Sequence, residues 1–157
     1  MTSRYFRAGV GTVIYNQSGQ IAIFKRAQHP VGVWELQQGG IDPNEHPREA
    51  MWRELAEEIG LTETDVTLTL EMPDWTIYQN RDASELLTDI LGQAHLWFFL
   101  YLKPGVKIDI SKASEEAVSD FCWTTFDDLI QRTGPHKQHV YRALKNHYSS
   151  QIQKPLV

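Results

Sequence analysis

The chain has 157 residues, the length of one domain, and its 41% hydrophobic content is high enough to form a core, which excludes a disordered chain. Its formal net charge of -5 argues against broad, non-specific binding of nucleic acid, including DNA, although a local basic patch remains compatible with it. The acidic excess also suits a protein that binds cations. We therefore expect a single domain over residues 1–157.

The single cysteine excludes an internal disulfide. Cys122 lies in "DFCWTTF", a strand-like run that favours a buried thiol over a nucleophile. No apolar run has the length of a membrane span, and the N-terminus lacks the apolar core of a signal peptide. These features predict a soluble cytoplasmic protein with no membrane partner.

The first third of the chain predicts a hairpin and a helix. Two β-rich runs, at 10–15 and 21–25, flank "NQSG", which is typical of a turn. A long connection rich in Gly and Pro follows. The helix is expected to begin near His46–Pro47, since proline is tolerated in a first turn, and to end at Gly60, a residue typical of a helix C-cap.

The rest of the chain alternates strand and helix patterns. The run "AHLWFFLYLK" at 94–103 is apolar on both faces, which predicts a central strand. The other expected elements are strands at 65–72, 75–78 and 121–126, a loop at 104–120, a short helix at 127–133 and a C-terminal helix at 139–151. This order predicts an α/β (α+β) fold with a mixed sheet flanked by helices.

The helix "REAMWRELAEEIG" gathers like charges on one face. At ~100° per residue, Glu54, Glu57 and Glu58 share an arc, whereas Glu49 points elsewhere as solvated surface. The arc lies beside an apolar stripe that suits burial: Met51, Trp52, Leu55 and Ile59. A solvated acidic face is one interpretation, and a bound divalent cation that compensates the repulsion is the other.

The flanking residues favour the cation. They complete the pattern G-x5-E-x7-R-E-U-x-E-E-x-G-U, where U is bulky and apolar: Gly39, Glu45, Arg53, Glu54, Leu55, Glu57, Glu58, Gly60 and Leu61. With all nine positions met, the chain resembles the Nudix hydrolases. The resemblance implies an α/β/α sandwich. It also implies Mg²⁺-dependent hydrolysis, with Mn²⁺ as a substitute, of a nucleoside diphosphate linked to another group.

The resemblance also implies roles for individual residues. Glu54, Glu57 and Glu58 would be the principal metal ligands, with a carbonyl of the loop at Gly39 or Gly40. Arg53 and Glu45 would support the loop and helix. For Arg53 the alternative is a structural ion pair, which differs little from this supporting role. The general base would be a glutamate of this helix or Glu115 or Glu116 of the later loop, with Glu116 favoured slightly. Two solvated loop carboxylates are the alternative.

Other segments resemble the bacterial branch that holds RNA 5′-pyrophosphohydrolases and diadenosine polyphosphate hydrolases: "FRAGVGTVIYN", "WELQQGGID", "DWTIY", "GQAHLWFFLYL" and "HKQHVYRALK". That likeness implies substrate contacts for Arg7, Arg26 and His136, and Lys137 could also meet a phosphate. An arginine can stack on a base or fork onto phosphates. An exposed strand-end arginine is the plainer interpretation of Arg26.

Some positions depart from that branch. Leu36–Gln37 replace its usual Phe-Pro, and Ala94–His95–Leu96 stand where lysines are typical. The loop at 79–90 is acidic where the branch is often basic. Fewer phosphate contacts lower the affinity for RNA, which weakens the case for an RNA substrate. A short dinucleotide or nucleotide needs fewer such contacts. Nucleotide sugars and modified nucleoside triphosphates are alternative substrates. A catalytically silent nucleotide-sensing domain is disfavoured because no signature glutamate is lost.

Overall fold

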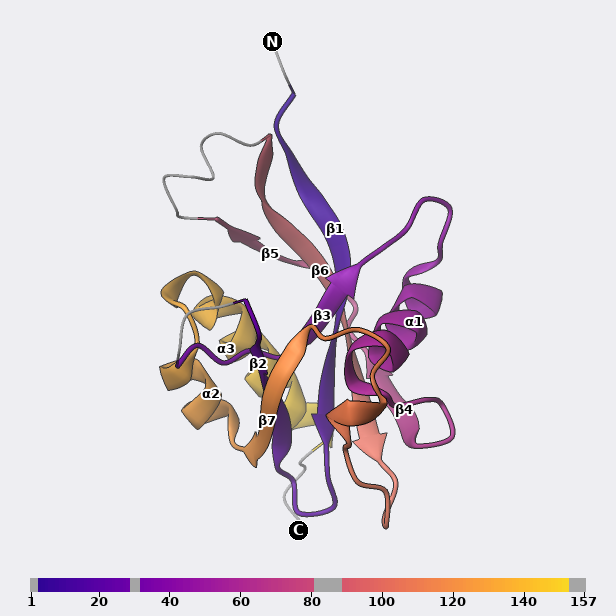
Figure 1. Ribbon diagram of the computed structural model, residues 1–157. Helices are drawn as coiled ribbons and strands as arrows, with labels where there is room; N and C mark the ends of the chain where they lie inside the picture. The colour runs from indigo at the N-terminus through magenta and orange to yellow at the C-terminus, as the bar shows by residue number, and fades with distance from the viewer. Residues whose placement is uncertain (1–2, 29–31, 81–88, 153–157) are drawn as a thin grey trace.

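The computed structural model describes residues 3–28, 32–80 and 89–152, and within them a mixed seven-stranded sheet lies between helices (Figure 1). Two long strands, β1 (Tyr5–Tyr15) and β6 (Ile90–Leu102), run parallel through its middle. The order is β4-β6-β1-β2-β7, with β3 paired to β1 and β5 paired to β6. The shorter strands are β2 (Ile21–Arg26), β3 (Gln37–Gly40), β4 (Val66–Glu71), β5 (Thr76–Gln79) and β7 (Val118–Thr124).

The expected central strand is confirmed, and it begins earlier than predicted, at Ile90. Successive side chains of β6 enter opposite cores, because strand side chains alternate in direction. Trp97 and Phe99 pack on one face of the sheet, and Phe98 and Leu100 pack on the other. Burial on both faces explains why this run lacks an alternating polar pattern. Most of the acidic loop at 79–90 lies outside the described residues.

The expected hairpin forms its turn, but its two strands do not pair along their length. The Asn16 carboxamide oxygen accepts from the backbone N–H groups of Ser18 and Gln20, and this closes the turn. Beyond it, β1 and β2 pair only at Tyr15 and Ile21. β1 then pairs with β3, and β2 pairs with β7. The prediction of a connection rich in Gly and Pro is wrong for "QQGG", which forms β3 because it pairs with β1.

The helix α1 (Pro47–Ile59) is confirmed with both predicted ends. The His46 ring accepts from the Arg48 N–H at the N-cap, and Gly60 adopts a left-handed φ of 78° at the C-cap. The buried stripe packs on the β1–β6 face, although Trp52 is only half-buried. Each large side chain buried there contributes roughly 1.5–3 kcal/mol. This packing fixes the orientation of the acidic face of α1.

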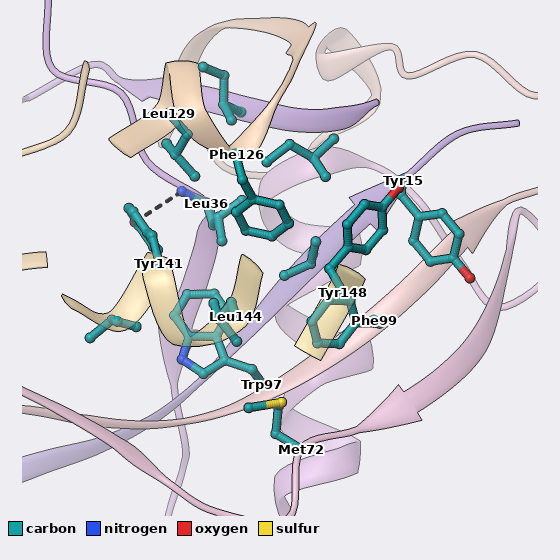
Figure 2. Packing of buried hydrophobic residues seen from close by; sticks show 14 of the residues in the cluster. Tyr15, Leu36, Met72, Trp97, Phe99, Phe126, Leu129, Tyr141, Leu144 and Tyr148 are labelled. Atoms are coloured by element: carbon teal, nitrogen blue, oxygen red, sulfur yellow. Dashed lines mark hydrogen bonds between the residues drawn. The ribbon is translucent and has the colours of Figure 1, made fainter. Parts of the chain in front are cut away.

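The opposite face of the sheet is covered by α2 (Phe126–Arg132) and α3 (Gln138–His147) (Figure 1). Figure 2 shows the aromatic packing beneath them, where the Leu36 N–H donates to the Tyr141 hydroxyl at 3.1 Å. That bond joins α3 to the chain just before β3. Short helical turns occupy Ile110–Lys112 and Pro135–Lys137, and a π-helical turn follows α3 at Tyr148–Ile152.

Two smaller expectations concern Cys122 and membranes. Cys122 lies on β7, half-buried against the aromatic core, with the Arg132 guanidinium donating toward its sulfur at 3.7 Å. None of the described helices is long and apolar enough to cross a membrane.

Gly11 is required for the contact between β1 and β6. A Cβ at this position would overlap the ring of Trp97, which is 1% exposed. We expect Gly11→Ala to lower the free energy of unfolding by about 1–3 kcal/mol, the usual effect of overpacking a core. Chemical denaturation of both proteins measures this, and equal midpoints would contradict the packing described.

Candidate active site

Three signature residues, Gly39, Glu54 and Glu58, line a cavity of about 650 Å³. Its walls come from β1, β2, β3, β5, β6, the C-terminal half of α1, the loop before β7 and the turn before α3. The lining residues are Arg7, Arg26, Gln28, Glu35, Gln38, Gly39, Gly40, Glu54, Glu58, Tyr78, Asn80, Gln93, Glu115, Ala117, His136 and Lys137.

The Arg53 guanidinium gathers the acidic face of α1. It donates to Glu45 at 2.8 and 2.9 Å, to Glu54 at 2.9 Å and to Glu57 at 3.0 Å. It also donates to the Gly40 carbonyl at 3.0 Å, which ties the glycine loop to the helix. Charge-assisted bonds in a planar fork fix direction as well as distance. Arg53 therefore holds both the carboxylates and the loop beside them.

A second guanidinium, that of Arg26, reaches α1 from the end of β2. It donates to Glu35 at 2.6 Å, to the two oxygens of Glu58 at 3.2 and 3.3 Å, and to the Gln38 carbonyl at 2.5 Å. The Gln37 amide also donates to Glu58, at 3.2 Å. The structure thus places Arg26 in the cavity wall, half-buried between carboxylates, rather than at an exposed strand end.

Burial and mutual repulsion disfavour ionisation of two signature carboxylates. Burial is the main cause that raises the pKa of Glu54, and the nearby charges of Glu57 and Glu115 add to it against the effect of Arg53. Burial likewise raises the pKa of Glu58, with Glu54 adding repulsion and Arg26 opposing. By contrast, the bond from Arg53 lowers the pKa of Glu45 to about 2.

These groups suit a hard divalent cation. Oxygen ligands on one helical face are what Mg²⁺ or Mn²⁺ prefers, and a cation would relieve the repulsion that raises the two pKa values. Gly39 allows the close approach, because a Cβ there would overlap the Glu54 carboxylate. Among the described residues, no three His, Cys, Asp or Glu side chains form a group placed to hold a metal ion. Glu57 is bound by Arg53, and Glu58 is bound by Arg26.

The other end of the cavity combines rings with a buried amine. The Lys137 ammonium is paired with Glu35 and lies 5.1 Å from the centre of the Tyr78 ring. The His136 and Tyr78 rings are 5.4 Å apart, edge to face. Arg7 is exposed and lines the same cavity. The four residues expected to meet substrate, Arg7, Arg26, His136 and Lys137, therefore share one cavity with Glu54 and Glu58.

The two candidate bases outside α1 differ in position. Glu115 lines the cavity, and its backbone N–H donates to the Glu57 carbonyl at 2.9 Å. Glu116 is exposed and is not among the lining residues, although the sequence favoured it slightly. Glu115 is thus the loop carboxylate that stands beside the helix.

Several polar residues of the cavity wall were not predicted from the sequence. Glu35, Gln37 and Gln38 escaped because they lie in the segment expected to be a connection. His95 was seen only as a departure from the branch. It is 1% exposed, stacks on Tyr78 at 5.8 Å, and neither ring nitrogen has a partner among the described residues. A histidine inside an otherwise apolar strand is the one signal that could have indicated a buried imidazole.

Comparison with known proteins agrees with this geometry. The model of the NUDIX domain matches residues 5–144. The chain belongs to this family. Its relatives include proteins named RNA pyrophosphohydrolase from Aeromonas hydrophila, 35% identical over 92% of this chain and 84% of the relative, and from Vibrio vulnificus, 33% identical over 92% and 86%. Membership indicates a hydrolase of pyrophosphate bonds.

Solved structures share the fold at lower identity. The E. coli dihydroneopterin triphosphate pyrophosphohydrolase superposes with a TM-score of 0.72 at 16% identity, over 93% of this chain and 99% of that one. A C. elegans Ap4A hydrolase gives 0.68 at 17% identity, over 91% and 98%. Both support the α/β/α sandwich expected for Nudix proteins.

The buried imidazole of His95 makes stability depend on pH. Burial, with the positive charge of Lys137, lowers its pKa from the ordinary 6.5 to about 3. Between these values the unfolded chain binds the proton more readily than the native one, so the free energy of unfolding falls as the pH drops below about 6.5. The loss is at most about 1.4 kcal/mol per pH unit.

Denaturation of the parent and of His95→Phe between pH 4 and pH 7 tests this. We expect the parent to lose more stability than the variant as the pH falls. Parallel curves would show that His95 is not the group responsible.

Proposed function

We propose that the enzyme hydrolyses the phosphoric anhydride at the 5′-triphosphate end of RNA and releases pyrophosphate. The observation that carries this proposal is the placement of the α1 carboxylates, with Glu54 and Glu58 in the wall of a cavity that also holds Arg7 and His136. The names of relatives that match nearly the whole chain support the substrate class. A role in RNA end processing would place the protein in the cytoplasm.

Mg²⁺ is the proposed cofactor, with Mn²⁺ as a substitute, and Glu54, Glu57, Glu58 and a carbonyl of Gly39 or Gly40 would hold it. When bound, it supplies neutralisation of phosphate charge and a water of lowered pKa. The chain itself orients these ligands. Arg53 fixes Glu54 and Glu57 relative to the glycine loop through the bonds described above.

The remaining roles follow from position. Glu115 would take a proton from the attacking water, since its carboxylate lines the cavity. Glu116, next to it in the chain, is an alternative base. A signature glutamate is the other candidate base. Arg7 and His136 would bind the phosphate chain and a base, and Arg26 and Lys137 would shape the wall behind them.

A second substrate is favoured by the charge of the cavity. Three cationic side chains line it, Arg7, Arg26 and Lys137, against four carboxylates, Glu35, Glu54, Glu58 and Glu115. A short dinucleoside polyphosphate needs fewer cationic contacts than an RNA end does. Nucleotide sugars and modified nucleoside triphosphates remain further candidates, and the absence of DNA binding stays a prediction.

Glu57→Gln tests the assignment of the helix. The change keeps the size of the side chain and removes the charge, so we expect turnover to fall roughly 100-fold or more while the fold stays intact. The matched control is Glu49→Gln, which removes the same charge from the exposed face of the same helix and should retain activity. Full activity in Glu57→Gln would overturn the assignment.

Substrate choice is tested by a product assay with Mg²⁺. A short 5′-triphosphorylated RNA and diadenosine tetraphosphate are offered side by side to the parent and to Glu57→Gln. Pyrophosphate release from RNA is the expected result. Turnover of the dinucleotide alone would replace the RNA proposal by the second candidate.

A further inference from the structure

Glu35 is a carboxylate enclosed in the cavity wall. It is 1% exposed, and its backbone is fixed by two hydrogen bonds with Phe24 of β2, at 2.7 and 2.9 Å. One oxygen accepts from Arg26 at 2.6 Å, and the other accepts from the Lys137 ammonium, which is itself 5% exposed. Glu35 thus joins two cations that come from distant parts of the chain.

Both cations also line the cavity, so Glu35 alters the charge that a substrate meets. Arg26 shares its charge with Glu58 as well, through bonds of 3.2 and 3.3 Å. Buried charges are screened far less than exposed ones, so their effect extends into the cavity. Within this group of ion pairs, the charges of Arg26 and Lys137 cancel those of Glu35 and Glu58. The lining also holds Glu54, Glu115 and the exposed Arg7.

Cations whose charge is already offset by carboxylates attract each added phosphate only weakly. Burying an ion pair is favourable only when the partners satisfy each other, so Glu35 and Lys137 keep one another in place. A phosphate chain that approaches Lys137 must compete with Glu35 for its protons. The geometry therefore works against longer and more highly charged chains.

We propose that Glu35 is a positioning residue that sets how the enzyme discriminates substrates by phosphate number, because it holds Arg26 and Lys137 in the wall and cancels their charge. This rests on the proposed function, since it concerns the same cavity. Glu35 does not need to touch the substrate. It acts through the two cations.

The test uses diadenosine tri-, tetra- and pentaphosphate, which differ only in phosphate number. Each is measured as an inhibitor of RNA turnover and, separately, by the rise it causes in the unfolding temperature of the intact protein with Mg²⁺. For the parent we expect affinity to depend weakly on phosphate number. For Glu35→Gln we expect it to rise about fivefold or more per added phosphate, the effect of one unit charge several ångströms away.

Three variants separate charge from structure. Glu35→Asp keeps the charge and should stay close to the parent. Glu35→Gln with Lys137→Met removes both partners, so the dependence should return toward that of the parent, and this variant leaves no buried ammonium without its counter-ion. Glu49→Gln removes a carboxylate from the exposed face of α1 and should change nothing.

The proposal is overturned if Glu35→Gln folds and shows the dependence of the parent, or if the double variant retains the full gain. A loss of kcat that is equal for all substrates, with unchanged affinities, would show a purely structural role and would also overturn it. Binding is read from the unfolding temperature even if the parent does not turn over RNA. Failure of the proposed function is therefore distinguishable from failure of this inference.

Discussion

The site depends on one arrangement, in which two guanidinium groups bind three carboxylates of α1, a helix that packs one face against the core. Arg53 binds Glu54 and Glu57 from the loop side, and Arg26 binds Glu58 from the sheet side. Like charges at i+3 and i+4 on a helix repel, and burial makes the repulsion stronger. Arg53 and Arg26 oppose the rise in the pKa of Glu54 and Glu58 that burial and repulsion cause, so they favour the charged form of both groups.

The fold supplies the rigidity that this arrangement requires. The apolar stripe of α1 packs on β1 and β6. Gly9 and Gly11 of β1 leave space for the His95 and Trp97 rings of the neighbouring strand β6. The short strand β3 pairs with β1 and places the glycine loop against the helix. A group held this way loses little entropy when it binds a ligand, so it can act with fixed geometry.

The elements with strong patterns were predictable from sequence. The helix Pro47–Ile59 had a proline at its start, a glycine after its end and a clear apolar stripe, and all three act as expected. β3 was not predictable, because "QQGG" has no strand pattern and is held by its partner and by the Thr12–Gln37 bond at 2.7 Å. Local propensity does not predict a strand whose formation depends on pairing with a distant part of the chain.

The candidate site likewise had a part that local pattern predicted and a part that depends on long-range contacts. Spacing alone gathered Glu54, Glu57 and Glu58, because helical geometry is fixed by the backbone. Spacing could not show that Arg26 lies between Glu35 and Glu58, since these three residues come from separate segments of the chain. Nor could it show Lys137 buried beside Glu35. Long-range ion pairs leave no period in a sequence.

The most direct test is a titration of the intact protein with Mn²⁺, followed by electron paramagnetic resonance of the free ion, in the absence of substrate. The parent is predicted to bind the ion, and Glu54→Gln is predicted to weaken binding tenfold or more, since it removes one charged ligand from the centre of the group. Glu49→Gln should bind as the parent does. Equal affinity in the parent and in a folded Glu54→Gln would contradict the assignment of the α1 carboxylates as the metal-binding group.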